Sequence, residues 1–383
     1  MKYFGTKLEN WTEEEGGWFD FIRLALAIMV LYFHCYHLAK PSGGSRIDIF
    51  SLAMRNQTTP GVMAVEGFFV ISGFLITMSW LRSLRGELGS FPIGCINFLF
   101  KRVLRILPGM VAATFFCVYV VGWIGAADPR AYLNSIDNLL VIRNAFTLNQ
   151  ITSAPPTFPD LDFPSLNGSL WTIRIEFECY LLLPLLALLG ILKRRALVLA
   201  IALVAWGAML AYFAKPNWAL LSWLPDSRFE HVRLVTYFLS GMALYLYRDH
   251  VRVSFWLLVV AVGILCIAAA AGSGLKVLLP LVGPYILIIC CFAPRPEFVN
   301  FYRGIDLSYG TYLYAWPVKL LILHFVGSDM NPDVLFIIAL PLVLLVAMFS
   351  WYIVEKPCLS LKSRLLVGER KSSPVGARSH KVQ

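Results

Sequence analysis

The sequence predicts an all-α polytopic membrane protein with about ten transmembrane helices and both termini in the cytoplasm. Of its 383 residues, 58% are hydrophobic and only 15% are charged, whereas soluble domains carry roughly a quarter charged residues. The apolar residues also gather into runs near the ~20 residues that a membrane-spanning helix requires. The net charge of +10 does not indicate a nucleic-acid partner, because an excess of basic residues is ordinary in the cytoplasmic loops of membrane proteins.

The apolar runs predict the helices directly. In chain order they cover residues 19–38, 62–81, 104–125, 169–191, 196–214, 231–247, 253–271, 275–293, 307–326 and 334–354. Each is close to the length that crosses the hydrocarbon core of a bilayer. An even number of crossings returns the chain to the side on which it begins, so both termini share one side.

The basic residues identify that side. Both termini and the joints at 82–105, 193–195, 248–252 and 295–303 hold 22 Lys and Arg, counting Arg23, whereas the opposite joints hold 9. Cytoplasmic loops carry such an excess of Lys and Arg. The first predicted helix therefore runs outward from the cytoplasm.

Two segments outside the predicted helices stand out. The loop 126–168 is the longest and is rich in Pro, Asn and Asp, which is typical of a cap over a substrate site or of a plain connector. Residues 356–383 are basic and rich in Ser and Gly, so we expect a disordered cytoplasmic tail attracted to anionic lipid. Residues 1–355 then form one transmembrane domain.

The sequence gives no support for a metal site or a serine triad. Its eight cysteines show no CxxC pair or regular spacing, and most lie in apolar runs, as small buried side chains do. His34 and His37 lack a Cys or Asp cluster at ligand spacing. No GxSxG-type turn accompanies any serine. We expect neither a bound metal nor a Ser-His-Asp triad.

The first predicted helix carries two polar side chains of unusual interest, Arg23 and His34. They are eleven residues apart, which is about three helical turns, so they share one face about 16 Å apart along the axis. Polar groups inside a membrane segment are costly and usually mark a functional site. The stripe places a cation near the cytoplasmic surface and a titratable imidazole toward the outer one. The alternative for His34 is a buried histidine that is hydrogen-bonded between helices.

Other titratable side chains are expected in the outer half of the bilayer with His34. They are Glu66, Arg174, Glu176, Glu178, Lys319 and His324. They require partners or water at that depth. Their assumed proximity to His34 favours the catalytic interpretation, with Glu176 orienting or stabilising the imidazole.

Basic residues also cluster where the third predicted helix begins. Lys101, Arg102 and Arg105 lie in the run FLFKRVLRILPG, and Arg102 and Arg105 share a helix face. The guanidinium fork suits phosphate groups, so these two residues and Arg23 are candidates to bind a phosphorylated donor. Anchoring at the cytoplasmic surface is the alternative.

These motifs together resemble the integral-membrane acyltransferase-3 family of bacterial envelope carbohydrate O-acyltransferases. The pair Arg23 and His34 matches the family's Arg-x10-His signature. The resemblance extends through VEGFFVISGFLI (65–76), KRVLRILP (101–108), SLWTIRIEFECYLLLP (169–184), SYGTYLYAWPV (308–318) and WYIVEKP (351–357). In the segment 169–184, the matching positions are those of Ser169, Trp171, Glu176 and Tyr180. Any single motif is weak, but their order is specific.

The resemblance implies an O-acyltransferase of the bacterial inner membrane. Acyl-CoA, in the first instance acetyl-CoA, would be the donor substrate, with no permanently bound cofactor. The catalytic candidates are His34 and Glu176, the donor-binding candidates are Arg23, Arg102 and Arg105, and further pocket candidates are Glu66, Ser169, Trp171, Tyr180 and Lys319. His34 would act as a general base or accept the acyl group covalently. The acceptor would be a glycan or a lipid-linked saccharide, with membrane lipid and polysaccharide-assembly proteins as further partners.

One position departs from the family pattern, and one other class of function fits the composition. Many members have a histidine before the Trp-Pro pair, where this chain has Ala315. Charges at mid-depth and helices interrupted by Gly and Pro are also typical of a transporter or exporter of a polysaccharide precursor. No internal repeat supports that alternative.

Overall fold

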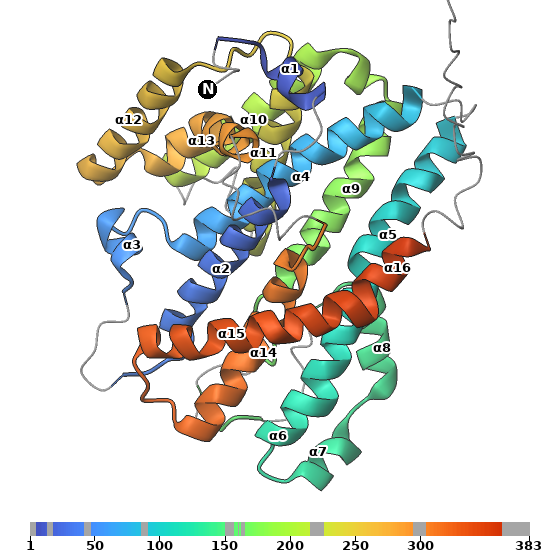
Figure 1. Ribbon diagram of the computed structural model, residues 1–383, viewed down its shortest axis with the longest axis vertical. Helices are drawn as coiled ribbons and strands as arrows, with labels where there is room; N and C mark the ends of the chain where they lie inside the picture. Colours follow the sequence, from blue (N-terminus) through green and yellow to red (C-terminus); the bar gives the residue numbers. More distant parts are fainter. Residues whose placement is uncertain are drawn as a thin grey trace, which may run out of the picture.

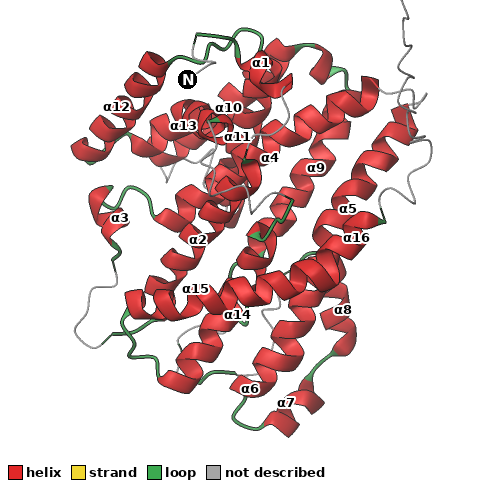
Figure 2. Cartoon of the chain, viewed as in Figure 1, coloured by secondary structure: helices red, strands yellow, loops and turns green. Residues whose placement is uncertain are grey.

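The computed structural model confirms the all-α fold class. It describes residues 5–13, 18–41, 47–85, 91–149, 157–159, 161, 165–214, 226–293 and 304–361. Within these residues the regular structure is helical, apart from one isolated β-bridge between Lys7 and Arg252. Figure 2 shows the described chain as packed helices joined by short loops.

The first half of the chain contains three long helices that carry predicted site residues. The helices are α1 (Leu8–Glu13), α2 (Phe19–Leu38), α3 (Ile49–Ala53), α4 (Pro60–Arg85), α5 (Phe91–Phe115), η1 (Phe116–Gly122), α6 (Trp123–Gly125), α7 (Pro129–Ser135) and α8 (Asn138–Phe146). The helix α2 matches its predicted bounds, and α5, the π-helical η1 and α6 run on as one 35-residue helix. The short helices α7 and α8 lie beside its end, at the bottom of Figure 1.

The second half follows the predicted runs closely. Its helices are α9 (Trp171–Leu188), η2 (Ile191–Lys193), α10 (Arg195–Ala214), α11 (Asp226–Leu246), α12 (Phe255–Ala271), α13 (Leu275–Phe292), α14 (Ser308–Val326), α15 (Pro332–Ser350), η4 (Trp351–Glu355) and α16 (Lys356–Ser360). The predicted tail therefore begins as helix α16, and its residues from 362 onward lie outside the described part of the chain.

Six described helices are long and apolar enough to cross a membrane: α2, α4, α5–α6, α10, α13 and α15–α16. The other predicted crossings, α9, α11, α12 and α14, are helical at their expected positions but are shorter or more polar. Of the three charged residues in α9, Arg174 and Glu178 are exposed and pair with each other, whereas Glu176 is half-buried. The fold is a multi-span helical bundle.

Two packing contacts set the geometry of the site. The helices α2 and α14 run in parallel, because Arg23 pairs with Asp306 just before α14, and the Lys40 amide bonds to the Ser328 carbonyl beyond its end. The helices α4 and α11 meet backbone to backbone. A Cβ atom added to Gly73 would lie 2.0 Å from the Phe238 carbonyl oxygen, and one added to Gly241 would lie 2.1 Å from that of Val70.

Candidate functional site

His34 lies where α2 packs against the later part of α14. Its ring meets the indole of Trp316 edge-on, with 5.0 Å between the ring centroids. The side chain is half-buried, and its Nδ1 atom is buried without a hydrogen-bond partner. The predicted alternative, a buried histidine hydrogen-bonded between helices, receives no support from the Nδ1 atom. An imidazole with an uncommitted nitrogen is available to take or give a proton.

Lys319 is the charged neighbour of His34. It is 0% exposed, and its Nζ atom donates a hydrogen bond of 3.2 Å to the Leu31 carbonyl, one turn before His34 on α2. An ammonium group has three N–H donors, so further donors remain beside the imidazole. The structure therefore brings together two residues that the sequence predicted at one depth.

Glu176 is not beside His34. Its Oε1 atom accepts hydrogen bonds from the Ser72 hydroxyl at 3.0 Å and from the Tyr180 hydroxyl. None of its contacts within the described residues is with His34. The expected depth did not identify the neighbours of Glu176. This residue lies one and a half turns into α9, and its side chain reaches the pocket that Arg23 also lines. A direct role for Glu176 in orienting His34 is inconsistent with this arrangement.

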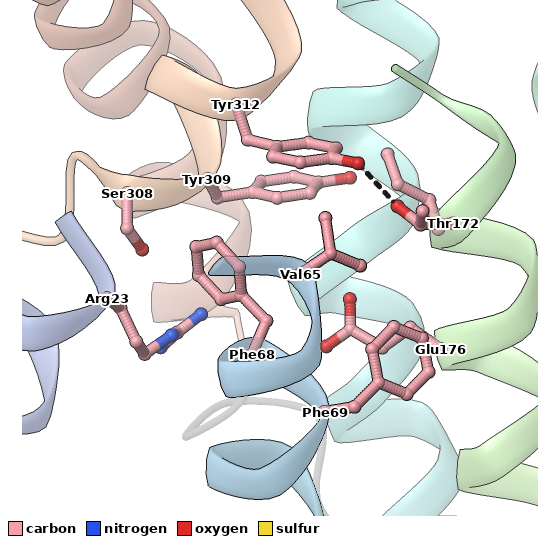
Figure 3. Close-up of a pocket in the computed structure, with 10 residues that line it drawn as sticks. Arg23, Val65, Phe68, Phe69, Thr172, Glu176, Ser308, Tyr309 and Tyr312 are labelled. Atoms are coloured by element: carbon pink, nitrogen blue, oxygen red, sulfur yellow. Dashed lines mark hydrogen bonds between the residues drawn. The ribbon is translucent and has the colours of Figure 1, made fainter. Parts of the chain in front are cut away.

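Arg23 and Glu176 instead share a narrow pocket, with Arg23 reaching it from α2 and Glu176 from α9 (Figure 3). Its cavity volume is about 40 Å³, and Phe68, Tyr309 and Tyr312 supply much of its wall. A hydrogen bond of 2.6 Å joins the hydroxyl groups of Tyr312 and Thr172. In this state the pocket has room for about one water molecule.

Asp306 pairs with two of the predicted donor-binding arginines, at the end of the bundle where α14 begins. Its carboxylate pairs with Arg23 at 3.0 Å and with Arg105, and it accepts the Ser308 amide at 3.0 Å. Burial alone would raise the pKa of this carboxyl group, but Arg105 and Arg23 lower it below the ordinary value. Two of the three predicted phosphate ligands thus already have an anionic partner.

Arg102 retains more freedom to bind a ligand. One of its terminal nitrogens donates to the Ser79 hydroxyl at 3.0 Å, while its buried Nε atom has no partner. Its guanidinium lies over the Phe98 and Tyr180 rings, 5.3 and 5.8 Å from their centroids. Stacking of this kind fixes the orientation of an arginine fork. Among the three predicted arginines, Arg102 is the best placed to receive a phosphate.

Glu66 lies in a separate polar group between α4 and α11. Its Oε1 atom pairs with Arg233, which also pairs with Glu230. Glu66 and Arg233 are 5% and 7% exposed, so this is a buried ion pair in a helix interface. None of the contacts of Glu66 within the described residues is with His34, so the expected shared depth did not bring these two side chains together.

The remaining predicted residues divide between structural and pocket positions. Ser169 is buried, with its hydroxyl donating to Asn167 at 2.6 Å and its carbonyl accepting from Tyr312 at 2.7 Å. Tyr180 links Glu176 to Arg102. Trp171 lines a cavity together with Glu66. Ala315 is buried beside Trp316 in α14. No cluster of metal-binding side chains occurs among the residues that the structure describes.

Sequence reasoning missed Asp306 and Arg233. Asp306 lies two residues before Ser308, and an aspartate there is a recognisable signal for the start of a helix. Arg233 is one of two arginines in α11, and an arginine this far inside an apolar helix requires a buried partner. Both signals were present in the sequence, but neither identified the partner helix.

Comparison with known proteins adds independent information. A family model described as an acyltransferase domain matches residues 17–356. An O-acetyl transferase of Shigella phage Sf6 is 29% identical over 348 residues, which cover 90% of this chain and 96% of that protein. Nodulation protein 10 of Rhizobium leguminosarum bv. viciae is 28% identical over 374 residues, covering 91% and 94% of the two chains. No solved structure matches the chain.

Proposed function

The chain belongs to the acyltransferase-3 family, and from this premise we propose that it moves an acyl group, in the first instance acetyl, from cytoplasmic acyl-CoA to a hydroxyl group of an extracytoplasmic glycan or glycolipid. The chain is an acyltransferase of a multi-span membrane fold. The bacterial inner membrane, the acyl-CoA donor and the glycan acceptor are parts of the proposal. The observation that carries it is the pair of polar centres at the two ends of the Arg23–His34 stripe.

The end of the bundle with Arg102 suits the nucleotide part of the donor. Phosphates of acyl-CoA would bind Arg102, whose Nε atom lacks a partner, and would lie beside the Arg23–Asp306–Arg105 group. The thioester arm would then extend toward His34 past the pocket of about 40 Å³. Because that pocket is too small for a pantetheine chain, Phe68, Tyr309 and Tyr312 must move aside when the donor enters.

The chemistry would take place at His34. The acceptor hydroxyl gives its proton to the imidazole while its oxygen attacks the thioester carbonyl carbon. The carbon–sulfur bond breaks, and the CoA thiolate takes the proton from the imidazolium. The products are an ester and free CoA. Lys319, whose ammonium lies beside this position, would stabilise the negative charge that develops on the carbonyl oxygen.

Replacement of His34 tests the proposal. We expect His34→Ala to lower acceptor-dependent release of CoA from acetyl-CoA by at least about 100-fold, which is the lower range for loss of a general base. The measurement uses purified protein, acetyl-CoA and envelope polysaccharide from which esters have been removed with mild alkali. A protein that became labelled by acetyl-CoA alone would indicate a covalent acyl-histidine route.

The matched control is His324→Ala. His324 is an exposed histidine near the end of α14, in edge contact with Phe158. Its replacement should leave the rate within about twofold, because a surface substitution away from the site has little effect. Near-normal turnover by the His34→Ala protein would contradict the catalytic assignment, and a wild-type protein that releases no CoA would favour the exporter.

A further inference from the structure

A second, larger cavity lies among α4, α9, α10, α11 and α13. Its volume is about 660 Å³, which is within the range of small-molecule sites. Aromatic side chains, including Trp171 and Tyr212, form part of its wall, and the Glu66–Arg233–Glu230 group forms another part. The mechanism described above uses none of these side chains.

The polar part of this wall has unused hydrogen-bonding capacity. The Glu66 Oε1 atom is paired with Arg233, and the Tyr237 hydroxyl also interacts with this carboxylate, but the buried Oε2 atom makes no hydrogen bond of normal geometry. The Thr58 hydroxyl, on a residue only 6% exposed, also lacks one. A buried acceptor without a partner is costly, so a ligand that donates hydrogen bonds here would recover that cost.

The charges of the wall favour a neutral ligand. Arg233 is shared between two carboxylates, with its Nε atom 3.1 Å from Glu230. Lys276 lies 5.3 Å from the centre of the Phe213 ring. Two carboxylates thus offset two cations, and the guanidinium is already committed. An anion such as a phosphate would gain little, whereas sugar hydroxyls can donate to carboxylates and a sugar's C–H face can pack on an aromatic ring.

Two short chain connections link this cavity to the surroundings of His34. Phe33 adjoins His34 and packs on Gly61, where an added Cβ atom would lie 2.4 Å from its ring. The next residue, Val62, lines the cavity. On the other side, Gly168 packs on the Trp316 ring that contacts His34. Three residues later, Trp171 lines the cavity.

We propose that this cavity is the acceptor subsite and that it holds a neutral sugar ring. Trp171 stacks on the ring, and the carboxylates of Glu66 and Glu230 accept its hydroxyl protons as hydrogen bonds. The neighbouring sugar then presents its hydroxyl group to His34. The assignment depends on the proposed acyl transfer and names the part of the chain that selects the acceptor.

Steady-state kinetics of two variants test the subsite. Trp171→Leu removes the stacking surface, and Glu230→Gln keeps the side chain's shape but removes its charge. With polysaccharide freed of esters as the acceptor probe, each should raise the KM for polysaccharide by about tenfold, equivalent to about 1.4 kcal/mol. The KM for acetyl-CoA should stay within about twofold. Loss of folded protein alone would lower the maximum rate and leave both KM values unchanged, so the rise in the KM for polysaccharide distinguishes the subsite from misfolding.

The control is Trp206→Leu. Trp206 lies on α10, where its indole donates to the Val277 carbonyl at 2.9 Å and faces a different cavity. Its replacement should change neither KM. Unchanged KM values for polysaccharide in both test variants would overturn the subsite. Competition between inorganic phosphate and polysaccharide would also overturn it, because the subsite is proposed to hold a neutral ligand. A wild-type protein without acetyl-CoA turnover would overturn the proposed function as well.

Discussion

At the scale of single residues, Arg102 is the strongest candidate to bind the donor. We expect Arg102→Ala to raise the KM for acetyl-CoA about tenfold, a loss typical of one charge-assisted contact. With S-acetyl-N-acetylcysteamine, which has the thioester but no phosphate, the KM should not change. Steady-state kinetics with both donors make the comparison, and an equal rise with both would show that Arg102 acts only through the fold.

Arg195→Ala provides the control for this measurement. Arg195 is also basic and is expected on the same side of the membrane, but it pairs with Asp249 at 2.8 Å instead of facing the donor pocket. Its loss should leave the KM for acetyl-CoA unchanged. A rise as large as that for Arg102 would indicate a general effect of positive charge on attraction of the donor.

Asp306 provides a prediction about stability. Asp306→Asn leaves Arg23 and Arg105 without their shared anion, and breaking a buried pair in this way costs about 3 kcal/mol. Thermal unfolding in detergent should show a large loss at neutral pH. As a control, Asp128→Asn changes an exposed capping residue to another good cap and should cost little.

The pH dependence of this loss follows from the lowered pKa of Asp306. A carboxyl group whose pKa is lower in the folded protein stabilises it above the unfolded value of about 3.9, and this contribution is lost as pH falls toward the folded value. The difference in stability between wild type and Asp306→Asn should therefore shrink below about pH 4. A difference that stayed constant down to pH 3 would contradict the ion-pair explanation.

The sequence predicted which polar residues lie inside membrane-spanning segments, but it did not predict which of them contact one another. His34 and Lys319 were correctly placed at one depth, because both positions follow from counting along parallel helices. Glu176 and Glu66 were misplaced, because depth does not specify which side of a helix faces which neighbour. That rotation is set by packing, such as the backbone contact of α4 with α11.

At the scale of helices, the α4–α11 interface depends on two glycines. Gly73→Ala or Gly241→Ala would place a Cβ atom about 2 Å from a carbonyl oxygen of the other helix, which forces the backbones apart. We expect a loss of about 1–3 kcal/mol for either change, typical of overpacking. Thermal unfolding monitored by size-exclusion chromatography provides the measurement.

Glycines without such contacts should respond in the opposite direction. No atom lies within 4 Å of a Cβ added to Gly207 in α10 or Gly263 in α12. Alanine there should be neutral or stabilise the helix by up to about 1 kcal/mol. Equal losses at all four positions would show that the close approach of α4 and α11 is not the cause.

The helix positions themselves were predictable because a membrane segment needs a continuous apolar run. The bounds of α2 agree with the prediction at both ends. The short helices α7 and α8 were not predicted in the loop 126–168, because their apolar residues form no long run. Asp128 and Asp137 are the N-cap residues of α7 and α8. An aspartate indicates the start of a helix only where the following residues already predict one.

At the scale of the whole molecule, the basic loops predict that both termini are cytoplasmic. Alkaline phosphatase, which is active only outside the cytoplasm, should be inactive when fused after residue 361 and active when fused after residue 128. Green fluorescent protein at the same positions should give the reverse pattern. Activity of the phosphatase at the C-terminal position would invert the orientation and remove the basis for a cytoplasmic donor.

The narrow pocket between Arg23 and Glu176 has a consequence for the energy supply of the cell. A permanent opening along the Arg23–His34 stripe would let protons leak inward and would dissipate the membrane potential. The pocket of about 40 Å³ between aromatic rings is narrow on this route, and under the proposed function a pantetheine arm that displaced the rings would occupy the space it opened. The proposed donor would then block proton flow through the opening while acyl transfer takes place.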